Sequence, residues 1–207
     1  KQYKEDRSPK DTIFNFGRCL AHFAVDKDEA FFTTKVDGPK TFFMPFNKGL
    51  PNGQGKGNPV NPNGHKTAYL WEHVLRRDTI ADIISNYTLM DYGETKTGKK
   101  VAHIMKNAKR LIFPRYHQLD VVTRLIDDVE TYGVGKRYLI MHSAGSGKSN
   151  SLTWLAYKII KVCPRSMEAR RAKALDMQLF DSAIIVTDRR LLDKQITDNI
   201  RAFGHSM

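Results

Sequence analysis

The sequence has no long apolar run and few cysteines. Its apolar stretches cover only a few residues each, whereas a membrane-spanning helix needs roughly 20 consecutive apolar residues. The two cysteines, Cys19 and Cys163, lie far apart in the chain and form no metal-binding spacing. The opening residues are polar and contain no recognisable targeting peptide. We therefore expect a cytoplasmic protein of a reducing compartment, with no membrane partner.

Acidic residues are scarce relative to basic ones. The 207 residues include 34 Lys and Arg against 22 Asp and Glu, which gives a formal net charge of +12. Such an excess favours a polyanionic partner. Residues 95–110 contain no acid and six basic side chains: Lys96, Lys99, Lys100, Lys106, Lys109 and Arg110. This stretch is either a solvated linker or a phosphate-contacting surface, with Lys99 and Lys100 as the candidate DNA contacts.

The first half of the chain is typical of an α+β domain. Three short strands are predicted over residues 22–25, 31–36 and 41–44, with a hairpin turn at Asp37-Gly38, and together they predict a β-meander. Residues 47–64 hold five Gly, three Pro and five Asn, a composition that excludes regular structure and indicates a functional or mobile loop. Helical periodicity returns near Trp71 and again from Asp78. Residues 88–110 are predicted to be a polar linker that contains the domain boundary.

The second half follows an α/β pattern. Strands are predicted over residues 137–141 and 183–187, and helices over residues 119–132, 152–162 and 191–203. Strands that alternate with helices imply a parallel sheet. The predicted fold class is therefore α/β in this half, joined to an α+β half with a meander.

A glycine-rich loop carries the strongest chemical signal. Residues 142–149 read His-Ser-Ala-Gly-Ser-Gly-Lys-Ser between a predicted strand and a predicted helix, as in the phosphate-binding pattern G-x-x-x-x-G-K-[ST]. Gly145, Ser146 and Gly147 would turn backbone amides toward phosphate oxygens at the positive end of the helix. Lys148 would reach the β- and γ-phosphates, and the Ser149 hydroxyl would ligate Mg²⁺. The pattern predicts ATP and Mg²⁺ as cofactors, with His142 in place of the first glycine.

The loop resembles motif I of superfamily 2 helicases and translocases, in which the first glycine is often another residue. Residues 113–119, Phe-Pro-Arg-Tyr-His-Gln-Leu, look like the adenine-recognition segment of these motors. This similarity implies that Gln118 reads the adenine edge and that Tyr116, next to Arg115, stacks nearby. The plain alternative is a solvated helix start.

A segment after the loop resembles motif Ia of the same motors, which touches the DNA backbone. It implies DNA contacts by three residues: Thr187, Asp188 and Arg189. A capping role for Asp188 at the final helix is the structural alternative.

The combination is similar to the R subunit, the restriction and motor subunit, of type I restriction-modification enzymes. Segments of the first half agree in their order: residues 2–7, 20–26, 43–49 and 69–72. The resemblance implies that residues 1–108 are the end of a nuclease domain with its linker, and that residues 109–207 open a RecA-like domain built on a parallel sheet. It also implies an ATP-dependent site-specific deoxyribonuclease that translocates double-stranded DNA, with methylation and specificity subunits as partners.

The carboxylate pairs that such an enzyme needs are missing from the expected places. Asp28-Glu29 is the only Asp-Glu pair, and it lies upstream of the loop in a polar turn, so it is not a Walker B pair. Glu94-Thr95-Lys96 with Asp82 fits a nuclease pattern only formally. We expect the nuclease site before Lys1, and Walker B and a second RecA-like domain after Met207. The chain alone should then bind Mg·ATP without hydrolysing it.

Two other function classes are compatible with a phosphate loop. A small P-loop kinase or other phosphotransferase would explain the loop, but not Gln118 ahead of it or the α+β first half. A non-catalytic DNA-binding or assembly module would keep the loop as a structural element only. Nucleotide binding separates the module from the enzymes, and DNA-stimulated ATPase activity separates the motor from the kinase.

Overall fold

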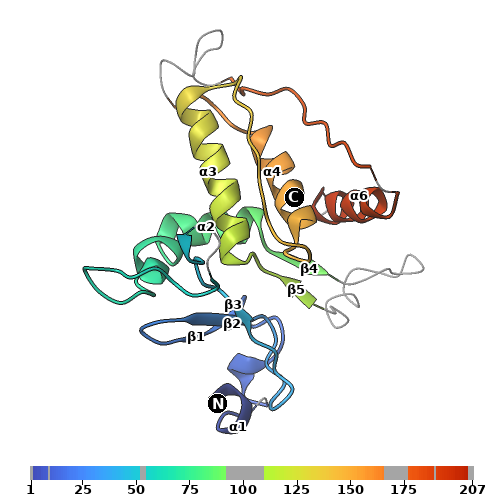
Figure 1. The fold of residues 1–207 in the computed structure, drawn as a ribbon. Helices are drawn as coiled ribbons and strands as arrows, with labels where there is room; N and C mark the ends of the chain where they lie inside the picture. Colours follow the sequence, from blue (N-terminus) through green and yellow to red (C-terminus); the bar gives the residue numbers. More distant parts are fainter. Residues whose placement is uncertain are drawn as a thin grey trace, which may run out of the picture. The chain divides into compact units, whose positions relative to one another are not determined.

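The computed structural model describes residues 2–8, 10–51, 55–91, 110–165, 177–188 and 190–204 (Figure 1). The chain divides into two compact units, Lys1–Tyr116 and His117–Met207, which are named here the N-terminal and C-terminal units. The domain boundary predicted after residue 108 lies outside the described residues. Within the described ranges, no helix combines the length and apolar content that crossing a bilayer requires.

The predicted β-meander is present in the N-terminal unit. Strands β1 (His22–Val25), β2 (Ala30–Thr33) and β3 (Met44–Pro45) form an antiparallel sheet in the order β1-β2-β3. Phe32 is opposite Phe23 on β1 and opposite Met44 on β3. The Asp37-Gly38 turn forms, since Gly38 has a φ of 50° and the Lys40 amide donates to the Asp37 carbonyl at 3.1 Å. It does not join two strands directly, however, because residues 34–43 form a longer connection between β2 and β3.

Aromatic rings form the core of the N-terminal unit. Phe32 and Phe46 are fully buried, and their ring centroids lie 5.4 Å apart in an edge-on arrangement. Phe23 meets Phe46 edge-on at 5.3 Å, and Phe113 lies 5.5 Å from Phe32. Tilted and edge-on geometries suit the charge distribution of aromatic rings, so the cluster gains more than buried area alone provides. Phe23, Phe32, Phe46 and Phe113 therefore pack into one core, whereas Phe42 is 74% exposed.

The remaining elements of the N-terminal unit include two helices and two strands that the sequence did not predict. Helices α1 (Gln2–Glu5), η1 (Thr12–Phe14), η3 (Leu70–Val74) and α2 (Arg77–Asn86) are short, and α1 and η1 are the unpredicted ones. Strands β4 (Leu89–Asp91) and β5 (Arg110–Ile112), also unpredicted, pair in antiparallel register. Residues 88–110, predicted as a polar linker, thus contain β4 and the first residue of β5, and residues 92–109 lie outside the described residues.

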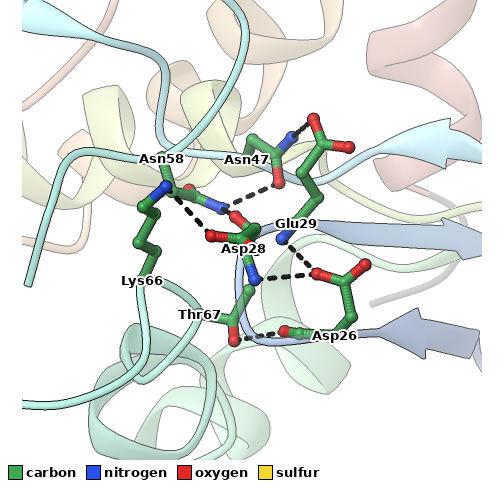
Figure 2. Close-up of polar contacts among 7 residues, drawn as sticks. All are labelled: Asp26, Asp28, Glu29, Asn47, Asn58, Lys66 and Thr67. Atoms are coloured by element: carbon green, nitrogen blue, oxygen red, sulfur yellow. Dashed lines mark hydrogen bonds and ion pairs between the residues drawn. The ribbon is translucent and has the colours of Figure 1, made fainter.

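Asn58 anchors the Gly- and Pro-rich loop to the turn between β1 and β2 (Figure 2). Its buried side chain accepts from the Lys48 amide at 2.8 Å and donates to the Asp28 carbonyl and to Asn47 Oδ1, both at 2.9 Å. Asn47 Oδ1 in turn accepts from the Ala30 amide at 2.8 Å. Amide side chains that satisfy buried backbone groups are a structural use of asparagine. The base of this loop is therefore part of the fold.

The described residues of the C-terminal unit include the three predicted helices. They are α3 (Tyr116–Tyr132), α4 (Lys148–Ile159) and α6 (Arg190–Gly204). Helix α4 packs against α6 through Trp154 and Phe203, whose rings meet edge-on at 6.1 Å. Asn199 Nδ2 also donates to Asn150 Oδ1 at 3.0 Å. These contacts place the start of α4, and the loop before it, on a packed helical support.

The two predicted strands of the C-terminal unit are not strands in the structure. Residues 137–141 and 183–187 have no regular secondary structure, and every strand pair among the described residues is antiparallel. Leu139 is 94% exposed and Val186 is 89% exposed. Apolar and β-branched residues favour a strand, but the strand forms only where a neighbouring segment supplies the hydrogen bonds. The chain is a mixed α/β protein with small antiparallel sheets, and the described residues show no RecA-like parallel sheet.

Candidate nucleotide-binding site

The loop at residues 142–149 leads directly into helix α4 of the C-terminal unit. Gly145 and Gly147 have φ values of 71° and 82°, in the left-handed region that glycine adopts without strain. Gly147 is the N-cap residue, and Lys148 begins the helix. The first turn of a helix leaves N–H groups without helical acceptors. Because the N-cap is a glycine, no side chain of that residue covers them, and the helix start can hold an anion.

Lys148 folds back over the loop that precedes it. Its ammonium donates to the His142 and Ser143 carbonyls, each at 2.9 Å, and the side chain is exposed. Ser149 follows on the first turn of α4 and is half-buried. Two neutral carbonyls at the start of the loop thus hold the Lys148 ammonium in place. A phosphate would compete well for it, since charge-assisted hydrogen bonds are roughly twice as strong as neutral ones.

The first turn of α3 holds the glycine end of the loop. Gln118 is buried, and its Nε2 donates to the Gly147 carbonyl at 2.8 Å. A Cβ at Gly147 would lie 2.4 Å from that nitrogen, so a side chain at this position would displace the end of Gln118. His117 Nε2 lies 3.0 Å from the Ser146 carbonyl. Residues on α3 therefore support two consecutive carbonyls of the loop.

Buried polar atoms without a partner cluster around this loop. In the part of the chain that the structure describes, Ser146 Oγ, Ser151 Oγ and His142 Nδ1 are buried and have no hydrogen-bond partner. An unpaired buried polar group costs about 1–3 kcal/mol, so native proteins retain few of them without a reason. Burial and the nearby charge of Lys148 lower the pKa of His142, against a smaller opposing effect of Asp120.

A small apolar cavity lies beside the loop. It has a volume of about 210 Å³ and is lined by His142, Lys148 and Ser151 together with apolar side chains of α3 and α4. Pockets that enclose a drug-sized ligand usually measure roughly 300–1,000 Å³. This cavity is too small and too apolar for a nucleotide. The loop surface, with its amides and Lys148, is the part suited to phosphates.

The structure brings together six of the predicted nucleotide-binding residues. These are Gly145, Ser146, Gly147, Lys148, Ser149 and Gln118. Arg115 and Tyr116, the first residue of α3, belong to the N-terminal unit, whereas the rest of α3 belongs to the C-terminal unit. There the Tyr116 ring meets Tyr69 edge-on at 5.0 Å, and Arg115 Nη2 lies 3.5 Å from Met44 Sδ. The adenine contacts expected of Gln118 and Tyr116 stay predictions.

The predicted DNA-contact residues are only partly described. Lys99, Lys100 and Arg189 lie outside the described residues. Thr187 is half-buried and Asp188 is exposed, just before α6. Their predicted DNA contacts stay predictions.

Three acidic residues at the turn between β1 and β2, Asp26, Asp28 and Glu29, have side-chain partners within the N-terminal unit (Figure 2). Asp26 Oδ1 accepts from the Asp28 and Glu29 amides at 2.7 and 2.8 Å, and these bonds lower the pKa of Asp26. Asp28 pairs with Lys66 at 2.9 Å, and Asp82 accepts from Asn86 at 2.7 Å. Among the described residues, no group of three or more His, Cys, Asp or Glu side chains is placed to hold a metal ion. The Asp28-Glu29 pair is therefore part of a turn.

Sequence reasoning missed two histidines at the loop. The His117 and His142 rings meet edge-on with centroids 4.9 Å apart. Their only signals in the sequence are that His142 replaces a glycine of the general pattern and that His117 precedes Gln118. Comparison of the chain with family models, with curated proteins and with solved structures gave no match.

Proposed function

We propose that this chain binds the phosphates of Mg·ATP at residues 142–149 and belongs to an ATP-dependent, DNA-translocating subunit of a type I restriction-modification system. The observation that carries the proposal is the loop itself. Two glycines with positive φ lead directly into the first turn of α4, and a lysine lies at the mouth of the loop. Backbone amides, a helix start and a cation at one point are the features that bind polyphosphates.

The residues of the loop fit a phosphate chain. A Cβ built at Gly145 would meet no atom within 4 Å, so the backbone is open to close approach there. Among the described residues, the Ser146 hydroxyl is buried without a partner, and the Lys148 ammonium donates only to the His142 and Ser143 carbonyls. Lys148 would exchange those carbonyls for phosphate oxygens, and Ser149 would hold the Mg²⁺ that neutralises phosphate charge.

The motor assignment rests on the resemblance of several segments to type I R subunits and on the net charge of +12. A basic protein neutralises DNA phosphates, and such binding is independent of sequence. Double-stranded DNA and the methylation and specificity subunits are the proposed partners. The DNA contacts at Thr187, Asp188 and Arg189 and the adenine contacts of Gln118, Tyr116 and Arg115 are parts of the same proposal.

Steady-state ATPase assays on this chain and on a longer subunit that contains it test the proposal. We expect the chain to bind Mg·ATP without turnover, and the longer subunit to hydrolyse ATP faster when duplex DNA is added. Lys148→Ala should abolish that hydrolysis, whereas Arg201→Ala, which removes an exposed charge on α6, should leave it unchanged. Hydrolysis that is indifferent to DNA but is driven by a small acceptor molecule would instead identify a phosphotransferase.

A further inference from the structure

His117 contacts the phosphate-binding loop at two points. Its Nε2 lies 3.0 Å from the Ser146 carbonyl, and its ring meets the ring of His142 edge-on at 4.9 Å. A carbonyl oxygen only accepts hydrogen bonds, so Nε2 carries the hydrogen in the first contact. His142 begins the loop and Ser146 lies near its end, so one imidazole joins both ends of the loop to α3.

The direction of the Ser146 carbonyl determines the direction of the next amide. In a planar trans peptide, the C=O of one residue and the N–H of the next point in opposite directions, and the described chain contains no cis peptide. When His117 holds the Ser146 carbonyl toward α3, the Gly147 N–H points away from α3. The Gly147 carbonyl accepts from Gln118 Nε2 and from the Asn150 and Ser151 amides of α4, so the Lys148 N–H points away from these groups.

We propose that His117 is a positioning residue for phosphate binding: its Nε2–H holds the Ser146–Gly147 peptide so that the Gly147 amide faces the phosphates. This inference rests on the proposed function, since it concerns the same loop. It assigns His117 a role in the affinity for phosphate groups and no contact with the nucleoside. His117 acts through the backbone of the loop.

Three variants separate the donor of His117 from its ring. His117→Phe keeps a ring beside His142 and removes the donor. His117→Gln places an amide N–H near the position of Nε2 and removes the ring. Thr123→Ala changes an exposed residue elsewhere on α3 and serves as the control. Each protein is titrated with Mg·ATP and with magnesium pyrophosphate by calorimetry, after its melting temperature has been measured.

His117→Phe should weaken the binding of both ligands by the same factor, about tenfold, which is the effect of losing one well-oriented hydrogen bond. His117→Gln should recover most of the affinity, and Thr123→Ala should match the original chain. Weaker binding of ATP with unchanged binding of pyrophosphate would overturn the proposal, because His117 would then act at the nucleoside. Equal affinities of the Phe variant and the original chain would also overturn it. If the original chain binds neither ligand, the proposed function itself is wrong.

Discussion

Alanine at Gly147 should destabilise the C-terminal unit more than alanine at Gly145, although both positions have positive φ. At 71° and 82°, both substitutions force an L-residue into the left-handed region, which costs roughly 1–2 kcal/mol. Only at Gly147 does the new Cβ meet a side chain, at 2.4 Å from Gln118 Nε2, whereas at Gly145 it meets nothing within 4 Å. The end of the Gln118 side chain must then move and lose its bond to the Gly147 carbonyl, at a further cost of about 0.5–1.5 kcal/mol, because that carbonyl keeps its bonds from the Asn150 and Ser151 amides.

Urea unfolding followed by Trp154 fluorescence measures this difference. Trp154 is fully buried between α4 and α6, and replacing the half-exposed Trp71 by Phe in every variant leaves Trp154 as the only tryptophan. We expect Gly147→Ala to lower the free energy of unfolding by about 0.5–1.5 kcal/mol more than Gly145→Ala does. In a Gln118→Ala background, the two substitutions should cost about the same, because the clash is gone. If Gly147→Ala and Gly145→Ala cost the same with Gln118 present as well as with Gln118→Ala, the contact between Gln118 on α3 and the loop would be refuted.

Three further outcomes are expected. Asn58→Ala should lower the free energy of unfolding, measured in urea, by about 2–3 kcal/mol, because it leaves buried backbone groups unpaired. Asn63→Ala, at an exposed position of the same loop, should change it by less than about 0.5 kcal/mol. The pKa of His142, measured by NMR, should lie below 6.5. The stability that the neutral imidazole contributes is therefore present above pH 6.5 and is lost as the pH falls through the folded pKa. Lys148→Ala should raise the pKa of His142, and an unchanged pKa would contradict the charge effect. Charge reversal of Lys99 and Lys100 should weaken duplex DNA binding and reduce its salt dependence, and an unchanged salt slope would identify a solvated linker.

The sequence predicted local features of the site correctly but did not predict which distant segments pair. The Gly-x-Gly-Lys-Ser run, followed by helical periodicity, predicted a loop that leads into a helix, and α4 does begin at Lys148. The glycine-rich loop and the helix that follows it each depend mainly on residues that are close in the sequence. Residues 137–141 read as a strand by composition, but a strand depends on a partner segment, which their own sequence does not specify.

Contacts between side chains and backbone groups that are distant in the sequence could not be predicted, because no sequence pattern marks them. Asn58 is one of five Asn in a stretch of low complexity, and only the fold shows that it is the one that anchors the loop to the Asp28 carbonyl. His117 lies 29 positions before Ser146. Its contact with that carbonyl depends on how α3 packs beside the loop, so a single sequence contains no periodicity or motif that would reveal it.

Titration of the 207-residue chain with Mg·ATP, followed through the backbone amide signals of the loop, tests the central claim most directly. The account predicts saturable binding that shifts the amide signals of Gly145, Gly147 and Lys148 more than those of the N-terminal unit. It also predicts that Lys148→Ala weakens this binding while Arg201→Ala does not. Unshifted loop amides at saturating nucleotide, or binding that is the same with Lys148→Ala, would contradict the assignment of residues 142–149 as a phosphate-binding loop.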